Sequence, residues 1–116
     1  MRTAVVILNW NGVHWLQKFL PSVVANSPDA TVVVADNGSQ DDSETYTRSQ
    51  HPEVLWLGMD ANRGYAGGYN TALKLLQDRH PELEYAVLMN SDIEPLAGWL
   101  EPLVTFLDAH PLAGAI

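Results

Sequence analysis

The stretches TAVVIL (residues 3–8) and TVVVA (residues 31–35) decide the fold, because each is apolar at every position after its first threonine. A strand with one face in water alternates apolar and polar residues, whereas a strand covered on both faces is apolar throughout. Both runs are also rich in β-branched residues, which favour strands. They predict buried strands of a parallel sheet that carries helices on both faces.

Short apolar runs and longer amphipathic stretches alternate along the rest of the chain. Further strands are predicted at residues 54–57 and 85–89, and a fifth begins at residues 113–116. Such alternation implies right-handed crossovers and a mostly parallel sheet. With 116 residues and no low-complexity linker, we expect a single three-layer α/β domain over residues 1–116.

Helices are predicted where apolar residues recur at helical spacing. The first includes residues 15–24, where Pro21 should kink or restart it, and the last includes residues 96–107. A polar helix with Ser39 or Asp41 as its cap is predicted before His51, and another helix follows the glycine-rich stretch 60–68. Three histidines precede proline at expected helix ends, so we interpret them as helix ends and not as metal ligands: His51, His80 and His110.

Composition and charge exclude several classes of function. Six basic residues against 14 acidic ones give a formal charge of −8, so no basic surface is available for nucleic acid. The absence of cysteine excludes disulfides, thiolate metal sites and cysteine nucleophiles. The apolar run near residue 5 is too short for a signal peptide or a membrane span, so we expect a soluble, cytoplasmic chain.

The ends of the four strands carry short polar side chains of one kind. They are Asn9 and Asn11, Asp36 and Asn37, Asp60 and Asn62, and Asn90 and Asp92. Each position alone is most simply a turn, because Asn and Asp hydrogen-bond to their own backbone. In parallel α/β sheets, however, ligands bind beyond the carboxyl ends of the strands, where the strand order reverses. Four such ends on one rim favour a polar ligand site.

Asp92, at the end of the strand 85–89, suits a hard cation. Mg²⁺ commonly takes one or two carboxylates, with water and substrate phosphates as its other ligands. Asn90 can hydrogen-bond a hydroxyl without adding charge, and Asp36 can accept from a base N–H or a sugar hydroxyl. Glu94 is a candidate second carboxylate, but its place before proline is more typical of a helix start.

The stretch NRGYAGGYN (residues 62–70) combines three glycines with the start of a helix. Glycine permits close backbone approach, and free N–H groups at a helix start attract anions. The alternative is a tight turn with close helix–sheet packing. Arg63, the only cation in the strand-end loops, is either a phosphate contact or a surface arginine.

Four segments in order resemble the family 2 glycosyltransferases of GT-A fold, over essentially the whole chain. VVILNWNG (residues 5–12) looks like the family's first strand with its nucleotide-contacting end. VVVADNGSQDDS (residues 32–43) looks like the second strand, with Asp36 at the position that contacts the nucleobase. NRGYAGGYN is similar to the family's Asn-x-Gly…Gly-x-Asn segment, and VLMNSD (residues 87–92) falls at its Asp-x-Asp metal motif. The resemblance is to rhamnosyltransferase-like and polysaccharide-assembly enzymes.

The resemblance implies transfer of a sugar from a UDP- or dTDP-linked donor, usually with inversion, to an acceptor hydroxyl in polysaccharide or glycoconjugate assembly. Mg²⁺ or Mn²⁺, held by Asp92, would neutralise the donor diphosphate. An amide replaces the first Asp of the family's motif, which leaves metal dependence open. The implied nucleotide-sugar site comprises Asn9, Asn11, Asp36, Asn37, Asn62, Arg63, Gly64, Gly67, Asn70 and Asn90.

The resemblance places the family's general base beyond residue 116, since Glu101 and Asp108 fall on a predicted helix. It implies a donor-binding half that lacks its acceptor half, binds a nucleotide and transfers sugar poorly or not at all. The full-length enzyme would use a saccharide or lipid-linked acceptor, with peripheral attachment to the inner face of the membrane as one arrangement. An apolar face left open by the missing half would favour self-association.

Other classes of protein are weaker alternatives. The first is a non-catalytic interaction or nucleotide-binding scaffold derived from the same fold. A receiver-type signalling domain has a similar length and acidity, but it needs an acidic pair where Asn9 and Asn11 stand. A dinucleotide-binding dehydrogenase needs more glycines after the first strand than Gly12, and a nucleotidyltransferase needs a glycine- and arginine-rich loop there.

Overall fold

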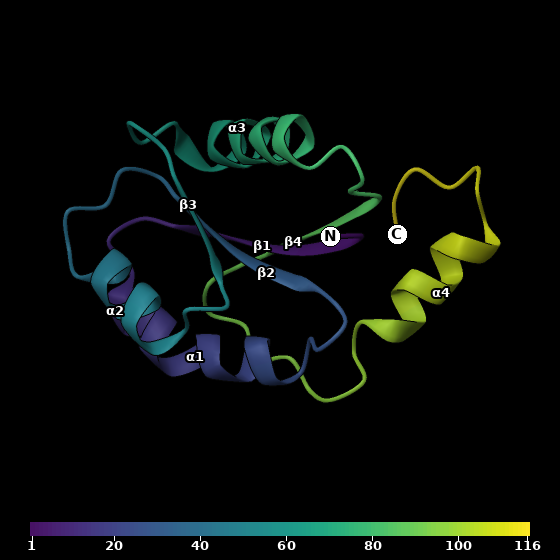
Figure 1. Cartoon of the computed structure of the whole chain (residues 1–116), viewed down its shortest axis with the longest axis horizontal. Helices are drawn as coiled ribbons and strands as arrows, with labels where there is room; N and C mark the ends of the chain where they lie inside the picture. The colour runs from purple at the N-terminus through teal and green to yellow at the C-terminus, as the bar shows by residue number, and fades with distance from the viewer.

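Four parallel strands form the centre of the computed structural model, which describes residues 1–116 (Figure 1). They lie in the order β3-β2-β1-β4. The strands are β1 (Thr3–Asn9), β2 (Thr31–Asp36), β3 (Leu55–Gly58) and β4 (Tyr85–Met89). The helices that follow them in turn are α1 (Val13–Ala25), α2 (Ser43–Gln50), α3 (Gly64–Arg79) and α4 (Glu101–Ala109). None of the four helices is both long and apolar enough to span a membrane.

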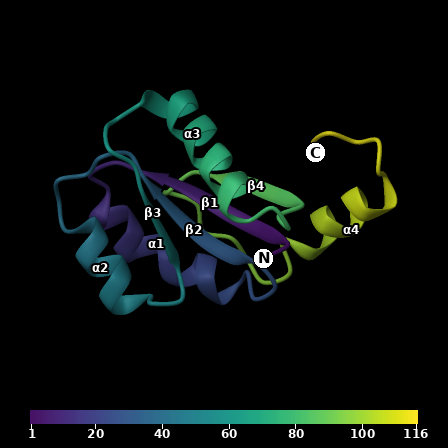
Figure 2. The same cartoon turned by 45° about the horizontal axis from the view of Figure 1, so that its top comes forward.

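Helices cover both faces of the sheet, which confirms the predicted three-layer α/β fold. Helices α1 and α2 lie on one face and α3 on the other (Figures 1 and 2). The central strand β1 sends Val5 and Ile7 into the core beside α1, and Ala4 and Val6 into the core beside α3. All four are at most 2% exposed. This burial on two faces explains why no polar residue interrupts the apolar run.

The strand order reverses at β1. Strands β2 and β3 follow on one side of it, whereas β4 returns to the other side after α3 has crossed the opposite face. Right-handed crossovers in these two directions require helices on opposite faces. The reversal places a potential ligand crevice beyond the carboxyl ends of β1 and β4.

Strand β4 is an edge strand, although its sequence predicts burial on both faces. Met89 is buried on the α1 side, but Ala86 and Leu88 face the other side and are exposed. The exposed fraction of Leu88 reaches 50%. An apolar groove of about 450 Å³ runs between β4, α4 and the chain end at Ile116. The packing within residues 1–116 therefore buries only some of the apolar side chains of β4.

Two predictions for the last twenty residues are wrong. The helix predicted over residues 96–107 begins only at Glu101, because Gly98 adopts a φ of +78°, outside the helical region. No residue of α4 is buried. The strand predicted at residues 113–116 does not form, since these residues have neither regular structure nor a partner strand.

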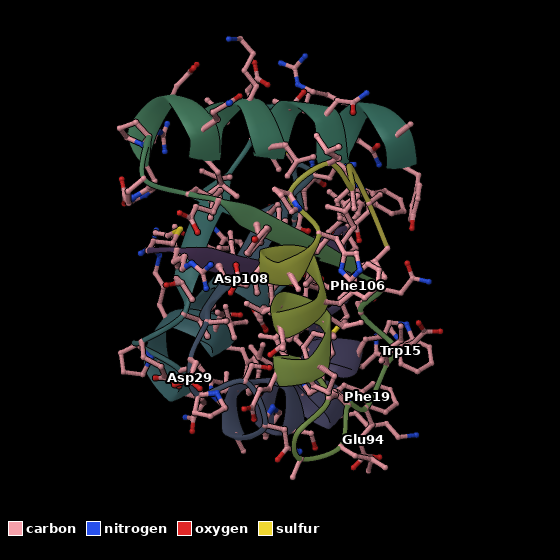
Figure 3. All side chains as sticks on the ribbon, turned by 90° about the vertical axis from the view of Figure 1, so that its right-hand side faces the viewer. Trp15, Phe19, Asp29, Glu94, Phe106 and Asp108 are labelled. Carbon is pink, nitrogen blue, oxygen red and sulfur yellow. The ribbon has the colours of Figure 1, made fainter.

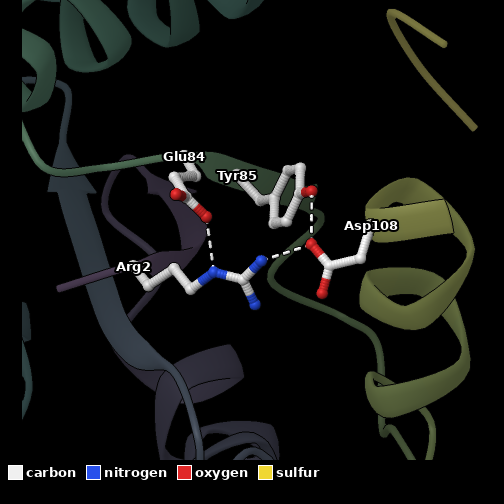
Figure 4. A network of polar contacts seen from close by, with 4 residues as sticks. All are labelled: Arg2, Glu84, Tyr85 and Asp108. Carbon is white, nitrogen blue, oxygen red and sulfur yellow. Dashed lines mark hydrogen bonds and ion pairs between the residues drawn. The ribbon is translucent and has the colours of Figure 1, made fainter. Parts of the chain in front are cut away.

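Polar contacts tie α4 to the amino ends of β1 and β4 (Figure 4), in addition to the partly buried Val104 of α4, which packs against the core. The guanidinium of Arg2 donates to Glu84 and to Asp108, and the Tyr85 hydroxyl donates to Asp108 Oδ1 at 2.7 Å. The hydrogen bonds from Tyr85 and Arg2 lower the pKa of Asp108. Helix α4 thus lies at the end of the sheet opposite to the polar strand ends (Figure 1).

The helix ends predicted from the His-Pro pairs are confirmed, since α2, α3 and α4 end at His51, His80 and His110. The restart predicted in the first helix is wrong, because α1 runs through Pro21 without a break. Proline cannot donate to the carbonyl of Gln17, but both residues are exposed. The unpaired carbonyl therefore lies on the solvent side of the helix, where water can satisfy it.

Asp41 joins the start of α1 to the start of α2. Its Oδ2 accepts from the Val13 backbone N–H and its Oδ1 from the Ser43 backbone N–H, both at 3.0 Å. Partial burial opposes the charged form, but these bonds and the one from the Ser43 hydroxyl outweigh it and hold the pKa of Asp41 below its ordinary 3.8. Asp41 thus holds the first N–H of α2 through its side chain, but the N-cap position itself is Asp42, so the prediction that Ser39 or Asp41 caps this helix is wrong by at least one residue.

Gly68 lets α3 approach the sheet closely. A Cβ at Gly68 would lie 2.8 Å from Leu8 Cδ1, whereas a Cβ at Gly67 would meet only Arg63 Cβ, at 3.4 Å. We predict that Gly68→Ala lowers the free energy of unfolding by about 1–3 kcal/mol, because the added Cβ would overlap the Leu8 side chain and lie 3.0 Å from Asn37 Nδ2, so that Leu8 or α3 has to shift. The matched control Gly67→Ala should be neutral or stabilising by up to about 1 kcal/mol. Equal urea unfolding curves for the two variants would contradict this packing.

Asp41→Ala should lower the free energy of unfolding by about 0.5–2 kcal/mol at pH 7, toward the lower end because Asp41 is partly exposed. Since the folded pKa lies below the unfolded value, this contribution is complete above about pH 5 and is lost as the pH falls through the folded pKa. Urea unfolding from pH 8 to pH 3 measures it. Asp42→Ala, at an exposed neighbour whose side chain caps nothing, is the control. An Asp41 effect that persisted unchanged at pH 3 would refute the assignment.

Candidate functional site

A pocket of about 300 Å³ opens beyond the carboxyl ends of β1 and β4, where the strand order reverses. Its walls come from both faces of the sheet, because α1 and α3 both begin at this rim. Parallel α/β sheets bind their ligands at this position. The lining residues are Leu8, Trp15, Tyr65, Tyr69, Asn90, Ser91 and Asp92.

Two larger hollows, of about 420 and 450 Å³, lie beside α4 at the opposite end of the strands. Figure 3 looks onto this end, with α4 and its Asp108 in front of the sheet. Neither hollow is lined by any residue of the predicted site. Size therefore does not identify the site, whereas topology and chemistry both favour the smaller pocket.

The ends of β1 and β2 form a buried polar cluster around Asp36. Asn9 Nδ2 donates to Asp36 Oδ1 at 2.9 Å. Ser39 donates to Asp36 twice, from its hydroxyl to Oδ1 at 2.6 Å and from its backbone N–H to Oδ2 at 2.9 Å. Asp36 is only 6% exposed. A carboxylate offers about four acceptor positions, so one position on Oδ2 has no partner within the chain, although Asp36 does not itself line the pocket.

Asn9 and Asn11 support this cluster. Asn9 is 1% exposed, and its Oδ1 has no hydrogen-bond partner. Asn11 adopts a φ of +47°, which Asn tolerates better than most residues. Its backbone N–H donates to the Ser39 hydroxyl and its Oδ1 accepts from the Gln40 N–H, both at 2.7 Å. Both predicted residues thus lie at the rim and shape the loops around Asp36.

Asn37 anchors the glycine-rich loop to the end of β2. Its Oδ1 accepts from the Arg63 backbone N–H at 2.9 Å, and its Nδ2 donates to the Gly64 carbonyl at 3.0 Å and to Asn62 Oδ1 at 3.3 Å. Asn62 Oδ1 also accepts from the Gly64 N–H at 2.8 Å. Gly64 adopts a φ of +73°, a left-handed conformation that glycine takes without steric strain. Asn37 and Asn62 therefore fold the loop that begins α3.

The other predicted residues of this segment do not line the pocket. The Arg63 guanidinium donates to Asp60 Oδ1 at 2.7 Å, and this bond lowers the pKa of Asp60. Gly67 and Asn70 both lie on α3, where Asn70 is exposed and Gly67 partly buried. A direct ligand contact by Arg63, Gly67 or Asn70 stays a prediction.

Asn90 and Asp92 both line the pocket and are exposed. No group of three or more His, Asp or Glu side chains could hold a cation by itself. The candidate second carboxylate, Glu94, accepts instead from the Ser22 hydroxyl of α1 at 3.3 Å and lies near Phe19 (Figure 3). A cation held by Asp92 would therefore have a single protein carboxylate and would need water and ligand phosphates to complete its coordination.

The sequence reasoning missed the aromatic walls of the pocket. Helical spacing predicts a buried Trp15, but this side chain is 38% exposed and stacks on Phe19 with 6.1 Å between ring centroids (Figure 3). Tyr69 is buried, whereas Tyr65, one helical turn earlier, is 66% exposed. Their rings meet edge to face at 5.1 Å. The sequence signal for this aromatic wall was the pair of tyrosines, Tyr65 and Tyr69, which lie four residues apart at the start of α3.

Comparison with known proteins identifies the family. The model of glycosyl transferase family 2 matches residues 4–116. The N-acetylglucosaminyl-diphospho-decaprenol L-rhamnosyltransferase of Mycobacterium tuberculosis is 26% identical over 119 residues, which cover 97% of this chain and 39% of that protein. An uncharacterised glycosyltransferase of Nostoc sp. is 32% identical over 74 residues, or 60% of this chain and 23% of that protein.

Solved structures share the fold. The solved chain of S. aureus TarS 1-349 in complex with UDP-GlcNAc matches with a TM-score of 0.76 and 22% identity, over 96% of this chain and 32% of that solved chain. The mannosyltransferase PcManGT from Pyrobaculum calidifontis, in complex with GDP-Man and Mn²⁺, matches with a TM-score of 0.71 and 22% identity, over 91% of this chain and 32% of that enzyme. The chain thus spans 39% or less of these proteins. It has a Rossmann-like α/β fold like that of GT-A glycosyltransferases, and it belongs to glycosyl transferase family 2.

Proposed function

We propose that this chain binds a UDP- or dTDP-linked sugar in the pocket beyond β1 and β4, as the donor-binding half of a glycosyltransferase. The observation that carries the proposal is the position of Asp92, which lines a pocket where the strand order reverses. Two complexes support it by shared fold, since TarS is solved with UDP-GlcNAc and PcManGT with GDP-Man and Mn²⁺.

The charge of the pocket requires a cation if the ligand is a diphosphate. No Lys or Arg lines it, and Asp92 is its only charged residue. Arg63, the nearest cation in sequence to the pocket tyrosines, donates to Asp60. An anionic donor would therefore meet a carboxylate in a chain of formal charge −8. Asp92 would hold Mg²⁺ or Mn²⁺, which supplies charge neutralisation for the diphosphate leaving group.

Asp36 is the proposed contact for the base or the ribose. The bonds from Asn9 and Ser39 fix its carboxylate and leave one acceptor position on Oδ2. A base N–H or a sugar hydroxyl is the complementary donor. Asn11, Asn37, Asn62 and Gly64 would serve the site indirectly, by shaping the two loops that border it.

Transfer of the sugar also needs a base that takes the acceptor's proton. The acidic residues Glu101 and Asp108 lie on α4, at the opposite end of the sheet from Asp92. We therefore assign the general base and the acceptor site to a longer, full-length enzyme, as a part of the same proposal. That enzyme would transfer its sugar with inversion to a saccharide or lipid-linked acceptor at the cytoplasmic side of a membrane, and residues 1–116 alone would bind the donor without efficient transfer.

Calorimetric titration with UDP and with dTDP tests the site. We expect binding in Mg²⁺ or Mn²⁺ and its loss in a chelator. Asp92→Asn should weaken the metal-dependent binding by at least about tenfold, or ~1.4 kcal/mol, because it removes the only carboxylate of the pocket. The fold should be unchanged, since Asp92 is exposed and its side chain makes no hydrogen bond within the chain.

Glu94→Gln is the matched control for this substitution. It removes the same charge two residues away, but the Glu94 side chain accepts from Ser22 and does not line the pocket. It should bind the nucleotide as the wild type does. Equal losses in the two variants would indicate a general effect of charge, and undiminished metal-dependent binding by Asp92→Asn would refute the proposed site.

A further inference from the structure

We propose that Tyr65 is a positioning residue for the nucleotide-sugar site. Its hydroxyl holds the side chain of Asn90 so that the amide nitrogen of Asn90 points to the bound nucleotide sugar. Asn90 then acts as a hydrogen-bond donor and not as a second cation ligand beside Asp92. This inference rests on the proposed function and assigns different roles to Asn90 and Asp92, hydrogen bonding to the ligand and cation binding respectively.

The hydroxyl of Tyr69 first fixes the end of β4. It donates to the backbone carbonyl of Met89 at 2.8 Å, in a position where Tyr69 is 3% exposed. Burial raises the pKa of Tyr69 to about 12, so the hydroxyl keeps its proton throughout the neutral range. The last residue of β4 is thereby tied to α3, on the face opposite to α1.

Tyr65 continues this arrangement one helical turn earlier. Its ring packs edge to face on the ring of Tyr69, with 5.1 Å between the centroids and an angle of 76°. Its hydroxyl donates to Asn90 Oδ1 at 2.9 Å. The two tyrosines thus act on adjacent residues: Tyr69 on the backbone of Met89, and Tyr65 on the side chain of Asn90.

The hydrogen bond from Tyr65 determines which end of the Asn90 amide is free. A primary amide has one acceptor oxygen and one nitrogen with two donor hydrogens. The oxygen is engaged by Tyr65, and the nitrogen makes no hydrogen bond within the chain. Cations bind amides through oxygen, and Tyr65 already occupies one of the two acceptor positions of this oxygen, so the oriented amide is better suited to donate from its free nitrogen to a phosphate or hydroxyl oxygen of the ligand. In a pocket without Lys or Arg, such a neutral donor adds attraction for an anion.

A double-mutant cycle on nucleotide affinity tests the coupling. The variants are Tyr65→Phe, Asn90→Ala and the two combined, titrated with UDP and with dTDP in Mg²⁺. Tyr65→Phe should weaken binding about 3- to 10-fold, the range expected for one lost hydrogen bond. The double variant should bind no more weakly than Asn90→Ala alone, because Tyr65 acts through Asn90.

Tyr85→Phe is the matched control. It removes a tyrosine hydroxyl that also donates to an acidic or amide side chain, in this case Asp108, at the far end of the sheet. It should leave the nucleotide affinity unchanged. Tyr65→Phe and Asn90→Ala should unfold in urea at the wild-type midpoint, because both side chains are exposed, so a shift in affinity reports on the site and not on folding.

Asn90→Asp separates the two roles of the side chain. If Asn90 donates to the ligand, the substitution removes the donor and adds repulsion against the diphosphate, so binding in Mg²⁺ should weaken. Tighter metal-dependent binding by Asn90→Asp would overturn the inference, because it would show a ligand position for the cation. Wild-type affinity in Tyr65→Phe would also overturn it while the proposed function stands. Failure of the wild type to bind either nucleotide would refute the proposed function itself.

Discussion

The central position of β1 is the constraint on which the rest of the structure depends. Because β1 has a parallel neighbour on each side and a helix layer on each face, four of its residues lose nearly all contact with water. The same position requires the strand order to reverse there. Helices α1 and α3 consequently begin at one rim but on opposite faces, and the pocket between them takes its walls from both. Core and site therefore follow from one topological feature.

The sequence predicts the parts of the fold that depend on local pattern. The runs at residues 3–8 and 31–35 predict β1 and β2, and the His-Pro pairs predict three helix ends, as observed. The errors concern features that depend on distant segments or on a single backbone angle. Leu88 belongs to an apolar run that predicts a buried strand, but the chain leaves half of its side chain exposed. Gly98 and Pro102, which stands in the first turn of α4, were the available signals for the later start, but the apolar spacing extends across them, so the last helix is predicted too early.

The same distinction, between what local sequence determines and what distant segments determine, applies to the candidate site. Asn and Asp bond equally well to their own loops and to a ligand, so composition cannot separate the two uses. The structure shows that Asp36 and Asn37 are largely engaged by their loops, whereas Asn90 and Asp92 line the pocket. The aromatic wall could not be predicted for a different reason. Trp15 follows the same helical spacing as the core residues of α1, and this spacing predicts burial. Trp15 lies where the sheet ends, however, so its side chain stays partly exposed.

Paramagnetic mapping with Mn²⁺ is the most direct test of the claim that the rim beside Asp92 holds a nucleotide through a cation. Amide resonances of the ¹⁵N-labelled chain would be recorded with UDP alone, with substoichiometric Mn²⁺ alone and with both. The account predicts that signals of Tyr65, Asn90 and Asp92 broaden strongly only when both are present, while those of Glu84 and Asp108 at the far end of the sheet stay sharp. Broadening centred on the far end, or broadening at the rim that does not depend on UDP, would contradict it.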